Sequence, residues 1–284
     1  MIIGGIEVGD GCAPFVVADL SANHLGSFDR AVDLIYKARF AGVDAVKLQI
    51  YDPDRLAARR GGKDKVVAEA PWAGRTLGDL FREAYTPREW FSELSVFHSC
   101  LFASVFDVQD VEYLEACDCI AYKIASREAP DWELVSKAAS TDKPLIISTG
   151  TATQAELGRS IAEAVKRNNQ VGLLYCISEY PTPLDHIDFS QIGALRYRYQ
   201  LPVGFSDHTL GVEAAVKAVE SGACIIEKHI TLSRADGGPD AAFSLEPAEF
   251  AKLVADVKDA YASLGTGERP ASEAPYRELR RHGA

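Results

Sequence analysis

Residues 101–150 read LFASVFDVQDVEYLEACDCIAYKIASREAPDWELVSKAASTDKPLIISTG, and this stretch decides the fold class. Short β-branched or aromatic runs alternate in it with segments of helical period: runs at 101–107, 119–126 and 144–150, and helical segments at 108–116 and 131–140. Strands that alternate with helices are typical of a parallel sheet joined by crossover helices. The stretch therefore predicts consecutive β/α units.

The same alternation continues in both directions along the chain. Strands are predicted at 15–23, 44–50, 101–107, 119–126, 144–150, 170–178, 202–209 and 224–231. Helices are predicted at 28–41, 86–98, 108–116, 131–140, 153–168, 188–199, 211–222 and 246–264. Eight such units predict an α/β fold of the (β/α)8 TIM barrel type, which typically takes about 250 residues. We expect the 284 residues to form one domain, 1–284.

Three segments lie outside this pattern. Residues 1–14 predict a short N-terminal hairpin that turns at Gly9-Asp10-Gly11 and plugs the amino-terminal end of the barrel. Residues 52–80 contain the polar sequence RRGGKDK and predict an active-site loop rather than core. Residues 265–284 predict a charged C-terminal tail.

Composition limits the partners. The chain has 30 basic and 41 acidic side chains, a net charge of −11, which argues against nucleic acid and anionic membranes as partners. An anionic substrate would need a local basic pocket. No apolar run approaches the roughly 20 residues of a membrane span, and MIIGGIEVGDG lacks the basic start of a signal peptide. The expected location is cytoplasmic.

Polar residues gather where the predicted strands end. They are Asp19 to His24, Lys47 and Gln49, Ser104 and Asp107, Lys123 and Ser126, Ser148 and Thr149, Ser178, Ser206 to His208, and Glu227 to His229. In a (β/α)8 barrel the carboxyl ends of the strands carry the active site. The pattern predicts one ring of functional groups at that end.

His208 and His229 end adjacent predicted strands and are candidate ligands of one divalent metal. Asp207, Glu227 and Asp240 are near in sequence and could add ligands or orient the imidazoles. The alternative is that each histidine is a hydrogen-bonded core residue.

Lys47 and Lys123 lie inside apolar strands, where an unpaired ammonium is costly, so each is expected to meet an anion. One possibility is a buried salt bridge with Asp19, Asp107 or Glu227. The other is a phosphate or carboxylate of the substrate, helped by nearby hydroxyls and backbone N–H groups.

Several motifs together give the chain a family resemblance. They are ADLSANH (18–24), VKLQ (46–49), VFD (105–107), YKIAS (122–126), ISTGTAT (147–153), YCISEYPTP (175–183), GFSDHTLG (204–211), EKHITL (227–232) and GPDAAFSLEP (238–247). In this order they resemble the sialic acid synthase family, over residues 13 to 264 or so.

The resemblance implies a metal-dependent condensation of phosphoenolpyruvate with the open-chain aldehyde of an amino sugar. The products would be a nonulosonic acid, which is a 2-keto-3-deoxy acid, and phosphate. His208 and His229 would hold the metal, with manganese expected and magnesium, cobalt or zinc as alternatives. A homodimer is also plausible by resemblance.

The resemblance also assigns site residues. Phosphoenolpyruvate positions fall on Lys47, Gln49, Ser104, Lys123, Ser126, Ser148 and Ser206. Tyr180 and Asp240 fall on positions that contact the sugar-like substrate. We predict Asp19, Lys47, Lys123 and Asp240 to be catalytic, and Ser178 and Glu227 to join the remaining residues in binding substrate.

The chain departs from the family pattern on the acceptor side. Asp19 stands where the family has Glu, Ser178 where it has Asn, and Ala241 where it has His. A shift of about 1 Å in a reacting group can cost on the order of a hundredfold in rate. We therefore expect an acceptor other than plain N-acetylmannosamine.

Family members also carry a C-terminal antifreeze-like domain that contributes an Arg to the substrate's N-acyl group, and we expect none in this chain. Arg55, Arg59 or Arg60 is a candidate substitute. Two other functions are compatible with the sequence. One is a non-catalytic or regulatory barrel that binds a phosphorylated ligand, and the other is a related metal-dependent aldolase or lyase.

Overall fold

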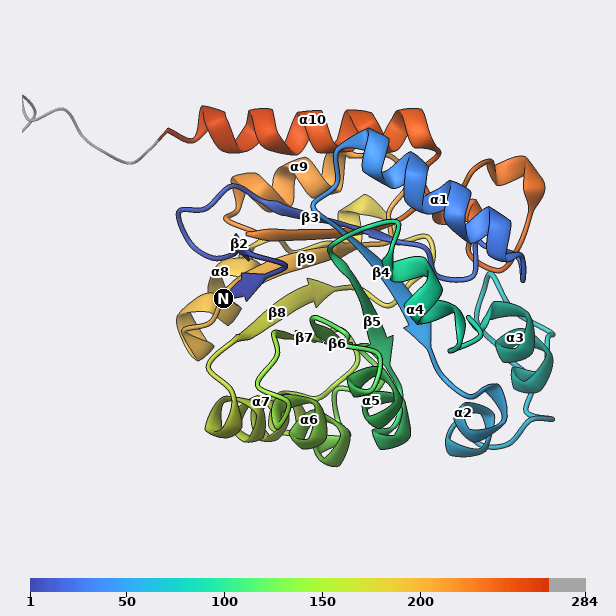
Figure 1. Cartoon of the computed structure of the whole chain (residues 1–284). Coiled ribbons are helices and arrows are strands. Elements are labelled where there is room, and N and C mark those ends of the chain that lie inside the picture. Colours follow the sequence, from blue (N-terminus) through green and yellow to red (C-terminus); the bar gives the residue numbers. More distant parts are fainter. Residues whose placement is uncertain (266–284) are drawn as a thin grey trace, which may run out of the picture.

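A computed structural model describes residues 1–265 and confirms the (β/α)8 barrel (Figure 1). Its eight parallel strands close in the order β10-β3-β4-β5-β6-β7-β8-β9. They are β3 (Phe15–Asp19), β4 (Ala45–Ile50), β5 (Leu101–Val105), β6 (Tyr122–Ile124), β7 (Leu145–Ser148), β8 (Val171–Cys176), β9 (Val203–Asp207) and β10 (Ile225–His229). Each predicted strand is present but shorter. The first one ends at Asp19 because Ser21 takes a left-handed backbone conformation, with φ of 44°.

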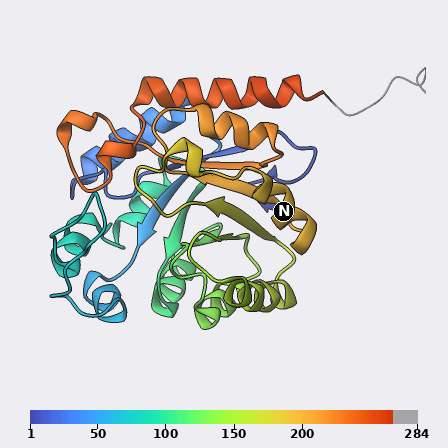
Figure 2. The same ribbon diagram turned by 180° about the vertical axis from the view of Figure 1, so that it is seen from behind.

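Helices surround the strands: α1 (Phe28–Ala41), α4 (Trp90–Ser95), α5 (Val108–Glu115), α6 (Trp132–Ala139), α7 (Gln154–Arg167), α8 (Ser190–Tyr199), α9 (Glu213–Glu220) and α10 (Pro247–Ser263). Figures 1 and 2 show α10 lying along α1 and α9, where it completes the outer layer. A capping box of Thr153 and Glu156 begins α7, and Gly42, with φ of 85°, ends α1.

The register of the strands brings functional side chains level with one another. Asp19 pairs with Lys47 across β3 and β4 and with His229 across β3 and β10. Ser206 pairs with Glu227 across β9 and β10. Side chains on a strand alternate between its two faces, so level residues with the same orientation meet inside the barrel.

The predicted N-terminal hairpin is present, but its predicted turn is wrong. Strands β1 (Ile2–Ile3) and β2 (Ile6–Glu7) are antiparallel and turn at Gly4-Gly5 instead of residues 9–11. Both glycines have positive φ, 56° and 85°, which a two-residue hairpin turn requires. Ile3 is fully buried, and a Cβ on Gly4 would lie 2.7 Å from Sγ of Cys100. The hairpin therefore packs against the end of the barrel where β5 begins.

The prediction that residues 52–80 form a polar loop is wrong in part, because they hold α2 (Pro53–Arg59) and the start of α3 (Leu77–Ala84). Side chains of Asp52 and Thr76 cap these helices. Leu56 is buried with Tyr51 and Phe106 in a second, smaller apolar cluster. Two helices with an apolar face therefore cover this side of the site, where we expected a loop.

Three arginines tie α2 to the barrel. Nε of Arg55 donates to Asp107 at 2.7 Å, Arg59 binds Asp131 and the carbonyl of Phe106, and Arg60 binds Glu128. Arg55 also contacts Asp110 at 3.2 Å. Directly after α2, Gly61 and Gly62 have positive φ, 111° and 105°. The chain thus leaves a fixed helix through two residues that tolerate a left-handed backbone.

The predicted helix 86–98 is also shorter than expected. α4 begins at Trp90, and Thr86 does not cap it. The Thr86 side chain is fully buried, and its hydroxyl lies 3.1 Å from Nε2 of His24. Thr86, just before α4, therefore contacts the loop that follows β3.

Within residues 1–265, no helix has the length and apolar character needed to cross a membrane. The predicted tail, 265–284, lies almost wholly outside the described residues.

Candidate active site

One cavity of about 350 Å³ opens at the carboxyl ends of the strands, and the residues predicted to be catalytic, to bind substrate or to hold the metal all line it. These are Asp19, Lys47, Gln49, Ser104, Lys123, Ser126, Ser148, Ser178, Tyr180, Ser206, His208, Glu227, His229 and Asp240. They come from all eight strands or from the loops that follow them. The structure thus gathers most of the predicted ring of groups, and their individual roles remain predictions.

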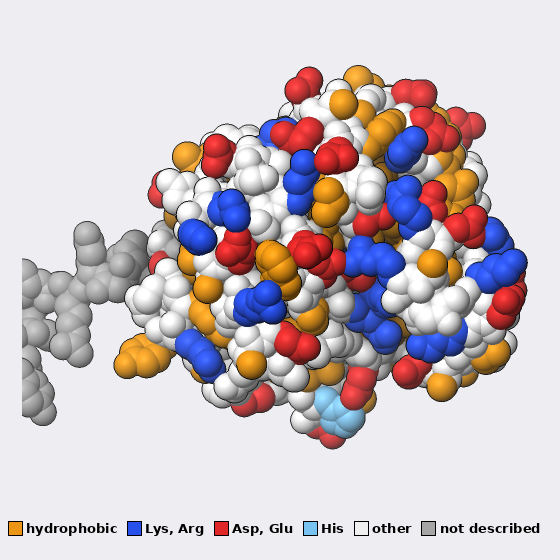
Figure 3. All heavy atoms as spheres, turned by 90° about the horizontal axis from the view of Figure 1, so that it is seen from below, with side chains coloured by type: hydrophobic (Ala, Val, Ile, Leu, Met, Phe, Trp, Pro, Cys, Tyr) orange, Lys and Arg blue, Asp and Glu red, His pale blue; other side chains and the backbone are white. Residues whose placement is uncertain are grey.

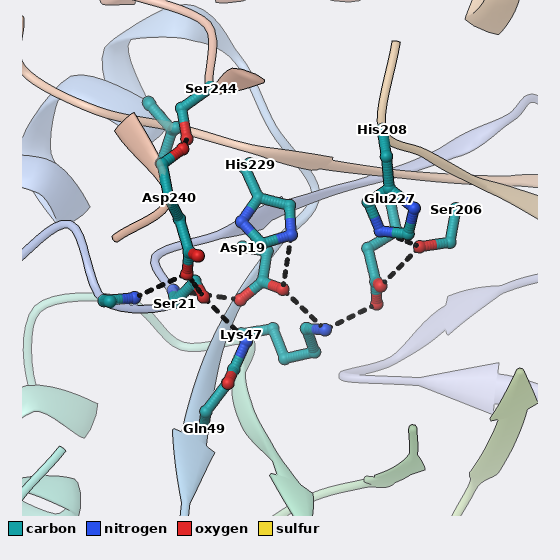
Figure 4. Close-up of polar contacts among 12 residues, drawn as sticks. Asp19, Ser21, Lys47, Gln49, Ser206, His208, Glu227, His229, Asp240 and Ser244 are labelled. Atoms are coloured by element: carbon teal, nitrogen blue, oxygen red, sulfur yellow. Dashed lines mark hydrogen bonds and ion pairs between the residues drawn. The ribbon is translucent and has the colours of Figure 1, made fainter. Parts of the chain in front are cut away.

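Two lysines and two carboxylates form an ion-pair cluster in the cavity, and Figure 4 shows Lys47 between Asp19 and Glu227. Nζ of Lys47 lies 2.8 Å from Asp19 and 2.9 Å from Glu227. Nζ of Lys123 lies 3.1 Å from the other oxygen of Glu227. The buried lysines therefore have internal ion pairs, as the first sequence alternative required. The same ammonium groups face the cavity, so the second alternative stays open.

Each charged group in this cluster shifts the pKa of its neighbours. Burial would lower the pKa of Lys47, but Asp19 and Glu227 raise it above its usual value. Burial would raise the pKa of Glu227, but Lys123 and Lys47 hold it well below its usual value. For Lys123, which has Glu227 as its ion-pair partner, burial prevails and lowers the pKa. Lys123 is thus the less well compensated of the two lysines.

A chain of short polar contacts connects Asp240 to β4. The hydroxyl of Ser21 donates to Asp240 and accepts from Nε2 of Gln49 at 2.8 Å. Asp19 accepts from the backbone N–H of Ser21 at 3.0 Å. Sequence reasoning did not single out Ser21, although it lies within the quoted motif ADLSANH.

The two histidine rings lie side by side, with centroids 5.6 Å apart. Nδ1 of His208 lies 3.0 Å from the carbonyl oxygen of Ile177, and Nε2 of His229 lies 3.6 Å from Asp19. Nδ1 of His229 is buried without a hydrogen-bond partner in the described chain. Burial and the nearby His229 lower the pKa of His208 to about 3, so this ring is neutral at pH 7. A neutral imidazole with a free ring nitrogen, as in His208, fits a divalent metal.

Two carboxylates considered in the sequence analysis lie elsewhere. Asp207 points away from the barrel axis and binds Lys228 at 2.7 Å, because it alternates along β9 with Ser206 and His208. Asp107 caps α5 and binds Arg55, so it pairs with neither Lys47 nor Lys123. Across residues 1–265, no three His, Cys, Asp or Glu side chains converge as a metal-binding group. Asp207 as an added metal ligand was therefore a wrong expectation.

Several hydroxyls in the cavity have room for another partner. Oγ of Ser104 and Oγ of Ser148 are buried and make no hydrogen bond within the described residues. Ser126 lies 3.1 Å from Thr151 and 3.3 Å from Ser178. Because buried hydroxyls are normally satisfied, two that are not indicate a place for ligand oxygens.

The cavity is much less acidic than the chain as a whole. Its lining has as many basic as acidic side chains: Lys47, Arg60, Lys65, Lys123 and Arg127 against Asp19, Glu69, Glu128, Glu227 and Asp240. Figure 3 shows acidic and basic groups interspersed on the face seen from below in Figure 1. The lining is therefore neutral on balance, and it is not the net basic pocket that we expected an anionic substrate to need.

Aromatic rings cover the histidines on the outer side. The Tyr180 ring lies 4.4 Å from the ring of His208, and Phe243 lies 5.1 Å from His229. Trp72 lies 5.2 Å from Tyr180 and lines the same cavity. Sequence reasoning missed Trp72 and Phe243. An isolated Trp in the polar segment 52–80 was the signal available for the first of them.

Comparisons with known proteins agree with this geometry. The NeuB family model matches residues 34–269. The chain is 40% identical over 262 residues to a pseudaminic acid synthase of Campylobacter jejuni, covering 89% of this chain and 76% of that protein. It is 34% identical to an N,N'-diacetyllegionaminic acid synthase of Legionella pneumophila, covering 98% and 81%.

A solved structure is similar along nearly its whole length. The N-acetylneuraminic acid synthetase of Leptospira borgpetersenii, in complex with citrate, superposes with a TM-score of 0.86 at 31% identity. The match covers 96% of this chain and 92% of that one. From the family model, these relatives and the shared barrel, it follows that the chain belongs to the NeuB family.

Proposed function

We propose that the chain is a phosphoenolpyruvate-dependent synthase that joins phosphoenolpyruvate to the aldehyde of a sugar or amino sugar. The enol carbon C3 would attack the aldehyde carbon, and water would add at C2. Phosphate would leave by cleavage of the C2–O bond, giving a 2-keto-3-deoxy acid of the nonulosonic type. Relatives named as pseudaminic, legionaminic and sialic acid synthases support this class of reaction.

The observation that carries the proposal is that buried ammonium groups line the same cavity as hydroxyls that make no hydrogen bond within the described residues. Lys47 and Lys123 supply two cations, and Ser104 and Ser148 supply two free donors in the same cavity. Charge-assisted and hydroxyl donors of this kind suit a phosphate and a carboxylate. Burial lowers the pKa of Lys123, so its ammonium group would be stabilised by a further negative charge nearby. An incoming anion would supply that charge and would compete with Glu227 for Lys123.

His208 and His229 would hold a divalent metal, in the first place manganese. When bound, such a metal supplies a Lewis acid that polarises the aldehyde oxygen. The chain's own residues would do the rest. Asp19 and Asp240 would position the aldehyde and the attacking water, while Lys47 and Lys123 would stabilise negative charge at the phosphate and carboxylate.

The acceptor we propose differs from plain N-acetylmannosamine. Asp19 has a shorter side chain than Glu, and the structure anchors it through Lys47 and the Ser21 N–H. The Asp19 carboxylate therefore lies closer to β3 than a Glu carboxylate would. An acceptor that reaches further into this space would restore the contact.

The decisive experiment is phosphate release from phosphoenolpyruvate by the purified chain with manganese, over a panel of sugar aldehydes that includes N-acetylmannosamine. Phosphoenolpyruvate labelled with ¹⁸O at the bridging oxygen should give labelled phosphate, because the C–O bond breaks. A Lys123→Met variant should lose activity, whereas exposed Lys252→Met should keep it. No phosphate with any acceptor, together with stabilisation by phosphoenolpyruvate alone, would instead favour a ligand-binding barrel without this activity.

A further inference from the structure

The segment between α2 and α3 forms a small hairpin at the cavity, the 66–76 hairpin. Val66 bridges Thr76, the N–H of Val67 donates to the carbonyl of Arg75 at 2.9 Å, and Gly74 donates back to Val67 at 2.9 Å. It begins shortly after Gly61-Gly62 and leads into α3, at the lower right in Figure 1. Most of its residues are exposed. The hairpin therefore borders the cavity without being part of the barrel core.

Trp72 fixes the tip of this hairpin to the opposite side of the site. Its indole N–H donates to the carbonyl oxygen of Pro239 at 2.8 Å. Pro239 directly precedes Asp240 in the loop after β10. One side chain thus joins the segment after β4 to the loop that carries a predicted catalytic carboxylate.

Trp72 also extends the aromatic cover of the histidines. Its ring lies 5.2 Å from Tyr180 and 6.3 Å from Phe243. Those two rings in turn contact His208 and His229. Trp72 therefore reaches His208 and His229 through one intervening ring each, while the ammonium groups of Lys47 and Lys123 make their ion pairs with Asp19 and Glu227.

We propose that Trp72 is a specificity-determining residue for the acceptor, an inference that rests on the proposed function. The indole face lies against the C–H face of the bound sugar, and its N–H to Pro239 holds the 66–76 hairpin closed. Aromatic rings suit this role because they offer a flat apolar face with one polar atom at the edge. Closure also shields the reacting atoms from bulk solvent, apart from the water that adds at C2.

The test compares Trp72→Phe and Trp72→Ala with Trp132→Phe, a half-exposed Trp on α6 that serves as the matched control. We expect Trp72→Ala to raise the KM of the acceptor at least tenfold while the KM of phosphoenolpyruvate changes less than twofold. Trp72→Phe keeps a ring but loses the N–H, so its acceptor KM should rise less. Trp132→Phe should behave like wild type.

Two kinetic results would overturn the inference. In the first, Trp72→Ala has the acceptor KM of wild type. In the second, both KM values rise together and the thermal midpoint falls, because Trp72 would then act only in folding.

A binding measurement separates this inference from the proposed function. Pseudaminic acid, N,N'-diacetyllegionaminic acid and N-acetylneuraminate serve as probes in titrations of tryptophan fluorescence. At least one acid should change the fluorescence of wild type and of Trp132→Phe but not of Trp72→Phe. Equal responses in all three proteins, or none, would refute a contact with Trp72. A wild type that releases no phosphate contradicts the proposed function, and the titration still decides the role of Trp72.

Discussion

Nδ1 of His208 lies 3.0 Å from the carbonyl oxygen of Ile177, so this nitrogen carries the proton and donates it. The lone pair of the neutral ring is then on Nε2, which lies 3.4 Å from Oγ of Ser206 in the cavity. The loop after β8 thereby fixes the tautomer of a ring that follows β9. His208 is held in the form that a metal ion requires.

This geometry predicts that His208→Ala abolishes the response to manganese. We expect manganese to raise the thermal midpoint of wild type but not of this variant, and phosphate release to fall by at least about a hundredfold, because one of the two proposed imidazole ligands is lost. Chelation of metal should inactivate wild type to the same level. His186→Ala, an exposed histidine paired with Glu179, should respond like wild type. An undiminished manganese shift in His208→Ala would show that the metal binds elsewhere.

Glu227→Gln should destabilise the protein by about 3–5 kcal/mol, because two buried ammonium groups lose a carboxylate. Urea denaturation measures this loss. The exposed pair Glu112 and Lys137 provides the control, and Glu112→Gln should cost less than about 1 kcal/mol. Inorganic phosphate should stabilise Glu227→Gln more than wild type, because the added anion replaces the lost one. Equal stabilisation of both proteins would argue against an anion site at Lys123.

Asp19→Glu should change acceptor preference and leave the binding of phosphoenolpyruvate intact. The longer side chain moves the carboxylate about 1 Å further into the cavity, so turnover with N-acetylmannosamine should rise relative to that with the preferred acceptor. Asp19→Asn keeps the shape but removes the charge, and we expect it to lose about a hundredfold in turnover. An unchanged ranking of acceptors in Asp19→Glu would show that this position does not select the sugar.

The ion pair of Lys228 and Asp207, both fully buried outside the barrel interior, should affect stability and not chemistry. Lys228→Met alone should lower the free energy of unfolding by about 3–5 kcal/mol, since Asp207 remains as an unpaired buried charge. The double variant Lys228→Met, Asp207→Leu should recover most of that loss. Phosphate release per folded molecule should stay near the wild-type value in both, and a selective loss of turnover would contradict this.

His24 predicts a loss of stability in mild acid. Burial, with a contribution from Arg30, lowers the pKa of His24 to about 4, against 6.5 for an ordinary histidine. Between pH 6.5 and 4 the unfolded chain therefore binds a proton that the folded chain does not, so stability falls as the pH falls. A difference of this size corresponds to at most about 3 kcal/mol.

Urea titrations from pH 8 to pH 4 measure the effect of His24. His24→Gln can keep the contacts with Thr86 and the Gly26 N–H, and its stability should depend less steeply on pH. Equal slopes in the two proteins would place the acid sensitivity elsewhere.

The barrel could be predicted from the sequence because every buried strand ends in polar residues at the same end. Lys47 and Glu227 each follow apolar neighbours, and a closed parallel barrel brings such positions together. The short hairpin was harder to place. Gly4-Gly5 and Gly9-Asp10-Gly11 both favour turns, and burial of Ile3 against the barrel decides between them.

Contacts between segments distant in sequence could not be predicted. Nothing local shows that Asp107 binds Arg55, or that Asp207 turns to Lys228 instead of the cavity. The polar sequence at 59–65 gives no sign that Leu56 before it and Leu80 after it are buried. Helical caps at Asp52 and Thr76 were the local signals for these two helices.

The three arginine contacts of α2 have a kinetic consequence. Because Arg55, Arg59 and Arg60 anchor α2, we expect the 66–76 hairpin to open by rotation of the chain about Gly61-Gly62. A product that leaves beneath Trp72 would wait for this rotation. Product escape would then limit the catalytic cycle, and turnover should slow in proportion to solvent viscosity when sucrose or glycerol is added.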